Sequence, residues 1–112
     1  MNQQQFEAFY SQFLDQMAAE RAKKNTDYTA DNDDPFHNFR AAALYGLCSA
    51  EIGVMTRLLD KVSRAATFLQ NKELVVKDEK IYDTLRDLAN YSIILAGLIK
   101  EREMGYANSR DA

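Results

Sequence analysis

The stretch IYDTLRDLANYSIILAGLI, residues 81–99, decides the fold because its apolar side chains recur at steps of three and four residues. One apolar stripe runs through Ile81, Leu85, Leu88, Ser92, Leu95 and Ile99, and Tyr91, Ile94 and Leu98 widen it. A stripe of this width predicts a helix that is buried from two sides. We expect this helix to begin near Asp78 and to run to about Met104, where Gly105 stops it.

Two further helical periods precede this stretch. Apolar residues of 6–22 predict an amphipathic helix with an aromatic stripe, and those of 52–69 predict a second helix that Ser49 caps. The segment between them begins with residues 23–35, which are polar and without a period, and this predicts a loop.

A short helix is expected after this loop. Asp33 or Asp34 stands before Pro35, which is the order of an N-cap and the first helical residue. We expect the short helix to run to Leu44 and Gly46 to end it.

The chain length and composition set the architecture. The 112 residues suffice for one hydrophobic core, and one Pro and four Gly interrupt few helices. We therefore predict an all-α, four-helix bundle in one domain over residues 1–104, with a flexible tail at 105–112. The broad apolar stripes predict that a homo-oligomer, either a dimer or a tetramer, completes the core.

Charge and residue usage exclude several classes of function. The net charge of −3 provides no basic field for a nucleic-acid polymer, although local Lys and Arg can still hold a free nucleotide. A single Cys and a single His exclude a Cys/His zinc cluster. No apolar run is long enough to span a bilayer, and the N-terminus lacks a signal pattern, so we expect a cytoplasmic protein without membrane contact.

Acidic residues at helical spacing are the candidates for a magnesium site. Asp83 and Asp87 are four residues apart, and carboxylates on two neighbouring helices suit Mg²⁺ bound to a phosphate substrate. The candidate metal ligands are Glu51, Asp60, Asp83 and Asp87. The alternative is ordinary surface ion pairing, because Asp60 lies within helical reach of Arg57 and Arg64.

Basic residues of the helix predicted over residues 52–69, which also contains Asp60, are candidates for binding phosphate. Arg57, Lys61 and Arg64 together carry ionised donors for a triphosphate. The alternative is a solvated basic face of a helix.

Four segments, taken in chain order, resemble one protein family. They are KNTDY at 24–28, DPFHNF at 34–39, GVMTRLLDK at 53–61 and DTLRDLANY at 83–91. Together they resemble the nucleotide modification associated domain family of phages and bacteria, over about residues 20–100. The layout of that family is similar to the MazG-like all-α nucleoside triphosphate pyrophosphohydrolases.

The resemblance implies a protein of phage nucleotide metabolism that uses magnesium to cleave a nucleoside triphosphate into a monophosphate and pyrophosphate. Glu51 and Asp87 fall near two of the four acids of the MazG-like pattern, whereas Val54 and Thr84 stand at the other two positions. The implied catalytic residues are Asp60, Asp83 and Asp87. The implied nucleotide-binding residues are Asn25, Asp27, Tyr28, Asn38, Arg57, Lys61, Arg64 and Asn90.

Two alternatives belong to other functional classes. A nucleotide-binding or nucleotide-sequestering protein without catalysis agrees with the two missing acids. A small helical adaptor would instead dock another protein through the aromatic N-terminal helix.

Overall fold

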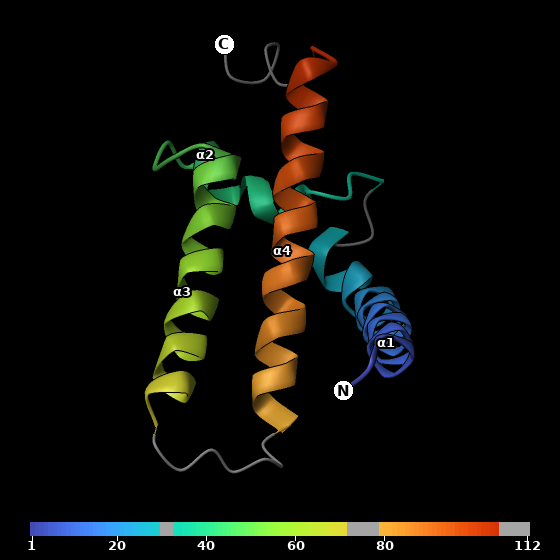
Figure 1. The fold of residues 1–112 in the computed structure, drawn as a ribbon. Helices are drawn as coiled ribbons and strands as arrows, with labels where there is room; N and C mark the ends of the chain where they lie inside the picture. Colours follow the sequence, from blue (N-terminus) through green and yellow to red (C-terminus); the bar gives the residue numbers. More distant parts are fainter. Residues whose placement is uncertain (30–32, 72–78, 106–112) are drawn as a thin grey trace.

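The computed structural model describes residues 1–29, 33–71 and 79–105, with the side chains of 26–29 and 79 left out of the description (Figure 1). The elements in the described residues are all helices, which confirms the all-α prediction. They are α1 (Gln3–Thr29), the 3₁₀ helix η1 (His37–Arg40), α2 (Ala41–Leu44), α3 (Ala50–Gln70) and α4 (Glu79–Glu103). The expected tail at 106–112 lies outside the described residues.

The helices α3 and α4 form an antiparallel hairpin that holds the core (Figure 1). Val54 of α3 and Leu98 of α4 are fully buried against each other's helix. The other buried residues of this cluster are Phe39, Ala50, Leu58 and Ile94. Part of the wide stripe predicted for residues 81–99 belongs to this core, because Ile94 and Leu98 are buried and Leu88, Tyr91 and Leu95 pack against the cluster. The expectation of burial along the whole stripe is wrong, since Leu85, Ser92 and Ile99 are exposed.

The residues expected to start α3 and to end α2 and α4 stand at these helix ends. The Ser49 hydroxyl accepts a hydrogen bond from the Ile52 N–H at 3.2 Å, so Ser49 is the N-cap of α3. Gly46, with φ of 72°, follows α2, and Gly105, with φ of 86°, follows α4. A residue without a Cβ adopts these left-handed angles without strain.

The short helix expected after Pro35 is split into two parts. The Asp34 carboxylate accepts a hydrogen bond from the Phe36 N–H at 3.0 Å, and one turn of η1 then leads into α2. The guanidinium group of Arg40 bridges Asp34 at 2.6 Å and Glu101 of α4 at 2.7 Å. The hydrogen bond with Asp34 raises the pKa of Arg40 above its usual value despite burial. This bridge fixes η1 against α4.

The predicted end of the first helix is wrong, because α1 continues through residues 23–29, where the sequence indicated a loop. The side chain of Lys24 reaches Asp87 of α4, and Glu20, one turn earlier, pairs with Arg86. These tertiary contacts favour the helical conformation over the turn preference of Asn, Thr and Asp residues. Residues 30–32 of the predicted loop lie outside the described residues.

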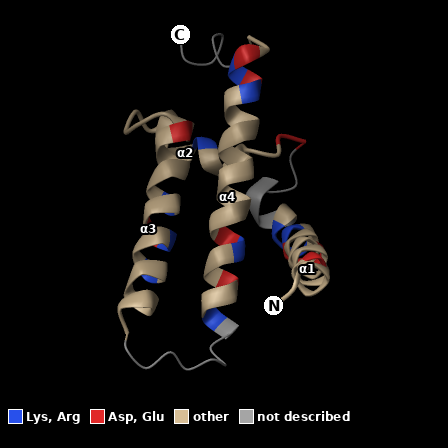
Figure 2. Ribbon diagram, viewed as in Figure 1, with Lys and Arg blue, Asp and Glu red and all other residues tan. Residues whose placement is uncertain are grey.

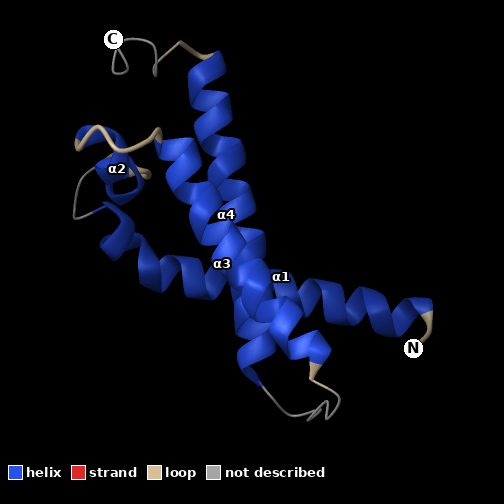
Figure 3. Ribbon diagram, turned by 90° about the vertical axis from the view of Figure 1, so that its left-hand side faces the viewer, coloured by secondary structure: helices blue, strands red, loops and turns tan. Residues whose placement is uncertain are grey.

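The first helix crosses α4 at a steep angle and projects beyond the hairpin on the side opposite α2 (Figure 3). Phe9 of the projecting part meets the Tyr82 ring edge-on, with ring centroids 6.5 Å apart. None of the described helices combines the length and the apolarity that crossing a bilayer requires.

Candidate functional site

Three helices meet at the carboxylate of Asp87. Lys24 of α1 binds one carboxylate oxygen at 2.9 Å, and Lys61 of α3 lies 3.1 Å from the other. The Asp87 side chain is only 21% exposed. Burial by itself raises the pKa of this carboxyl, but the hydrogen bonds from the two lysines outweigh burial and hold the pKa below its ordinary value. Asp87 is therefore an anion that joins α1, α3 and α4.

A hollow of about 360 Å³ lies next to this junction, between α3 and α4. The residues that line the hollow are Thr56, Arg57, Asp60, Lys61 and Tyr91. The guanidinium carbon of Arg57 lies 4.8 Å from the centroid of the Phe39 ring and 6.0 Å from that of the Tyr91 ring. Among the described residues, Arg57 makes no ion pair with an acid. The aromatic rings thus orient a cation that no described carboxylate neutralises.

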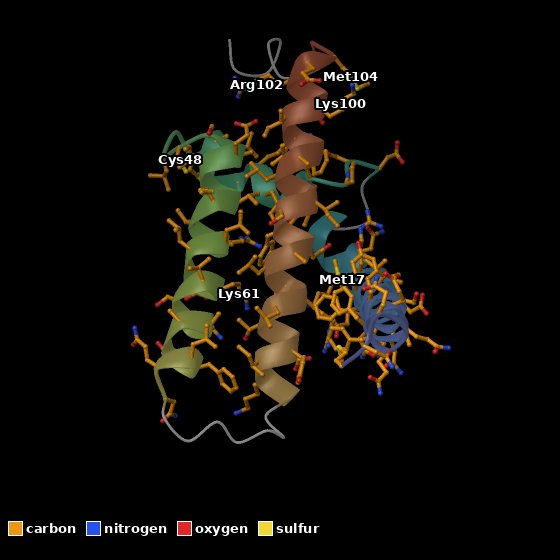
Figure 4. The ribbon with its side chains drawn as sticks, viewed as in Figure 1. Met17, Cys48, Lys61, Lys100, Arg102 and Met104 are labelled. Atoms are coloured by element: carbon orange, nitrogen blue, oxygen red, sulfur yellow. The ribbon has the colours of Figure 1, made fainter. Side chains whose placement is uncertain are left out.

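The charge around this hollow is positive. Of the charged side chains that line it, Arg57 and Lys61 are basic and Asp60, which pairs with Arg64, is acidic. Figure 2 shows basic residues of α3 along the part of the helix that lies beside α4. Lys61 lies between the two helices, whereas Lys100 lies near the far end of α4 (Figure 4). The hollow therefore suits an anion.

The four acids predicted to bind magnesium do not meet. Glu51 pairs with Arg102 at 3.0 Å near the start of α3, and Asp60 pairs with Arg64 at 3.1 Å on the same helix. Asp83 pairs with Arg86. Within residues 1–29, 33–71 and 79–105, no three His, Cys, Asp or Glu side chains lie close enough to hold a metal ion.

The divergence of Asp83 and Asp87 has a physical cause. The two residues are stacked one turn apart on α4, as their spacing predicted. Arg86 attracts Asp83 toward itself, whereas the two lysines attract Asp87 toward α1 and α3. As placed in a single chain, the four acids expected to bind magnesium are therefore held apart by their basic partners.

The remaining residues predicted to bind a nucleotide lie in several places. Asn90 lines a small recess between α1 and α4 together with Lys24 and Asp87. Asn25 is exposed on α1, and Asn38 is exposed on η1. Asp27 and Tyr28 belong to the last turns of α1, but their side chains lie outside the described residues. The structure thus brings Asn90 close to the junction at Asp87, whereas Arg64 stands beside the hollow through its pair with Asp60.

The sequence reasoning did not select three residues that the site contains. Lys24 belongs to the first of the four motifs, and the structure identifies it as a partner of Asp87. Tyr91 and Thr56 line the hollow. The signal that could have identified Tyr91 is its helical spacing, because it follows Asp87 by four residues and so lies on the same face of α4.

Comparison with known proteins yields no relative of this chain. No protein-family model matches it, and no match was found among curated proteins or among solved structures. A functional assignment therefore depends on the geometry around Arg57, Lys61 and Asp87.

Proposed function

We propose that this chain binds a nucleotide through its phosphates, in the hollow between α3 and α4. The observation that carries the proposal is the arrangement of Arg57. Its guanidinium group is held over the rings of Phe39 and Tyr91 and has no acidic partner among the described residues. A planar guanidinium group presents paired N–H donors that match the oxygens of a phosphate group.

Lys61 supplies the second cation. It follows Arg57 by one helical turn, so both side chains leave the same face of α3 and line the same hollow. Asp87, which also binds Lys24, holds the ammonium group of Lys61 at the α3–α4 interface. The excess of basic over acidic side chains favours a polyphosphate, which carries several negative charges, over a singly charged anion.

Groups suited to the base and sugar lie beside these cations. Tyr91 presents an aromatic ring at the hollow, and an aromatic ring stacks on a base of any type. The hydroxyl of Thr56 already donates a hydrogen bond to the Gly53 carbonyl at 2.6 Å, and its oxygen can still accept one. The hollow volume lies within the range of small-molecule sites.

We further propose that binding takes place without hydrolysis. Each of the acids Glu51, Asp60, Asp83 and Asp87 is neutralised by a basic side chain of the same chain. A carboxylate held by an ammonium or guanidinium group is a poor ligand for a cation, because the ion must displace that partner. The observed pairing thus favours the non-catalytic alternative over magnesium-dependent release of pyrophosphate.

Isothermal titration calorimetry tests the binding step. The full chain is titrated with ribo- and deoxynucleoside triphosphates, with EDTA and separately with magnesium. We expect one nucleotide class to bind in EDTA, and Arg57→Gln to weaken the affinity by about tenfold or more, the scale of one charge-assisted hydrogen bond. The matched control is Lys100→Gln, which removes an exposed cation at the far end of α4. Absence of binding by the folded wild type, or equal affinity of Arg57→Gln, would contradict the proposal.

Product analysis by mass spectrometry tests the absence of hydrolysis. The protein is incubated with the same triphosphates, with and without magnesium or manganese, beside an active pyrophosphohydrolase as a control. We expect the triphosphates to remain intact. Monophosphate and pyrophosphate that disappear in an Asp83→Asn, Asp87→Asn double variant would establish the hydrolase instead.

A further inference from the structure

The helix α3 carries a second apolar stripe that points away from α4. Its spacing alternates three and four residues, which is the a/d pattern of a coiled coil. The stripe consists of Ile52, Met55, Leu59, Val62, Ala66 and Leu69. Every member is exposed, and the five large side chains are between 44% (Met55) and 73% (Leu69) exposed. We call these six residues the α3 seam.

The α3 seam and part of α4 share one face of the hairpin. Met55 stands two residues from Gly53 and from Arg57, so it lies about 200° around α3 from both. Gly53 lies near the Phe39 carbonyl, and Arg57 lies over the Phe39 ring, so Met55 faces away from η1. Ile99 of α4 likewise faces away from this region. Gly97, two residues before it, lies beside the Phe36 ring, and Glu101, two residues after it, pairs with Arg40.

The uncovered face also includes Leu85 and Ser92, which precede Ile99 at intervals of seven residues. Leu85 and Ile99 are exposed. The small residue between them permits another helix to approach closely. In the described part of the chain, η1 and α2 contact the opposite face of the hairpin, and α1 projects on this uncovered side (Figure 3).

The chain exposes more surface than a folded monomer of its size. Its accessible surface is 8371 Å², whereas about 6,300 Å² is typical of a 12.8 kDa monomer. Its radius of gyration is 16.6 Å, against roughly 13 Å for a compact domain of this length. The excess of roughly 2,000 Å² exceeds the approximately 800 Å² that each partner buries in an interface of standard size.

We propose that a second copy of this chain covers this face, with the two α3 seams packed antiparallel about a two-fold axis. The positions on one flank of the seam are Thr56, Ser63 and Gln70, which carry no charge. Those on the other flank are Glu51, Leu58 and Ala65, of which only Glu51 is charged, and it pairs with Arg102 of the same chain. A self-paired interface brings identical flanks together, and uncharged flanks avoid repulsion between like charges. Heterologous partners are usually selected through complementary charges at these positions, and Glu51, the one charged residue there, is already paired with Arg102.

The sizes of the seam residues favour the antiparallel orientation. With the axis between Leu59 and Val62, these two residues oppose each other across the interface. Met55 then meets Ala66, so a large side chain fills the space beside a small one. A parallel pair would place Ala66 against its own copy and leave a gap.

The first helix extends the proposed interface. It projects on the side of the hairpin that the second copy would occupy (Figure 3). It carries the exposed side chains of Phe6, Tyr10 and Leu14. Thr56 borders both the α3 seam and the hollow, whereas Arg57 lies over the Phe39 ring, on the side away from Met55. The two proposals are tested by different substitutions, Arg57→Gln for nucleotide binding and Leu59→Lys with Val62→Lys for the dimer, so a failure of one leaves the other intact.

Sedimentation velocity over a wide concentration range tests the proposal on the full chain. We expect a reversible dimer for the wild type. In a Leu59→Lys, Val62→Lys double variant, opposed ammonium groups should raise the dissociation constant by at least about a hundredfold. The matched control is Thr67→Lys, an exposed substitution on α3 outside the seam, which should leave the dimer unchanged.

Mixing charge variants keeps the test independent of folding. The Lys variant is combined with a Leu59→Glu, Val62→Glu variant, and circular dichroism verifies the helicity of each. Pairing of the seams predicts that the mixture forms a heterodimer while each variant alone is a monomer. A monomeric wild type at millimolar concentration, or a dimer that resists the Lys substitutions, would overturn the proposal.

Discussion

Lys61 and Asp87 link the two helices of the hairpin across 3.1 Å, and the same carboxylate binds Lys24 of α1. One acid therefore satisfies two ammonium groups from segments that are far apart in the chain. The pair is largely withdrawn from solvent, with 17% of the Lys61 side chain and 21% of the Asp87 side chain exposed. Screening by water is weaker here than at an exposed pair, so this contact contributes more to stability.

Replacing Asp87 with Asn should destabilise the chain. The amide retains the shape of the side chain but removes the negative charge that Lys24 and Lys61 share. We expect a loss of about 1 to 3 kcal/mol in the free energy of unfolding, measured by urea denaturation at neutral pH. Asp60→Asn, which affects only the exposed pair with Arg64, should cost less than about 1 kcal/mol. Equal losses would contradict the central role of Asp87.

The contribution of Asp87 to the free energy of unfolding should depend on pH in the acid range. Because the folded-state pKa lies below the ordinary value of about 3.9, folding favours the ionised form. This stabilisation is fully present above the ordinary pKa and is lost as the pH falls through the folded-state pKa. The difference in unfolding free energy between the wild type and Asp87→Asn should therefore shrink below about pH 4. A difference that grows as the pH falls would contradict the assignment.

Two helical glycines should respond to alanine in opposite directions. A Cβ at Gly97 would lie 2.8 Å from the ring tip of Phe36, whereas a Cβ at Gly53 would meet nothing closer than 3.8 Å. Gly53→Ala should stabilise the chain by about 0.5 to 1 kcal/mol through helix propensity. Gly97→Ala should destabilise it by about 1 to 3 kcal/mol, because the Phe36 ring must move.

Thermal and urea unfolding of both glycine variants measure this contrast. A Phe36→Leu substitution shortens the opposing side chain, so Gly97→Ala should cost less in that background than in the wild type. Stabilisation by both single alanine substitutions would show that Phe36 yields without cost.

Arg86 should control how firmly α1 is attached. Its guanidinium group pairs with Glu20 of α1 at 2.9 Å and lies 5.8 Å from the centroid of the Phe13 ring. In Arg86→Met, we expect amide hydrogens of α1 to exchange about tenfold faster, while those in the centre of α3 change little. Arg64→Met, which removes an exposed pair on α3, is the control. Unchanged exchange in α1 would show that apolar contacts alone hold this helix.

The sequence predicted the helices well where apolar period and capping residues agreed. Ser49 and Gly105 set their helix ends as expected, and Ile94 and Leu98 of the stripe in residues 81–99 are buried. The same stripe was wrongly expected to be covered throughout, because Leu85 and Ile99 are exposed. The prediction was wrong for residues 23–29, because local preference for a turn competes there with an ion pair to Asp87, 63 residues away. No local pattern contains information about that partner.

The candidate site was predicted only in part for the same reason. The basic residues of α3 share a helical face, so spacing alone grouped Arg57 with Lys61. Spacing also grouped Asp83 with Asp87, but it did not indicate which basic residues would pair with each acid. The direction of a long polar side chain depends on its tertiary neighbours, and these are fixed only once the helices have packed.

The attachment of α1 through Lys24 and Glu20 has a consequence for protein synthesis. Lys24 leaves the ribosome 63 residues before Asp87, and at typical elongation rates this interval lasts roughly 3 to 13 s. Until then the aromatic residues of α1 have no α4 to contact, and the nascent chain exposes them. Chaperones that recognise apolar segments can bind the emerging helix during this interval, before the hairpin exists to receive it.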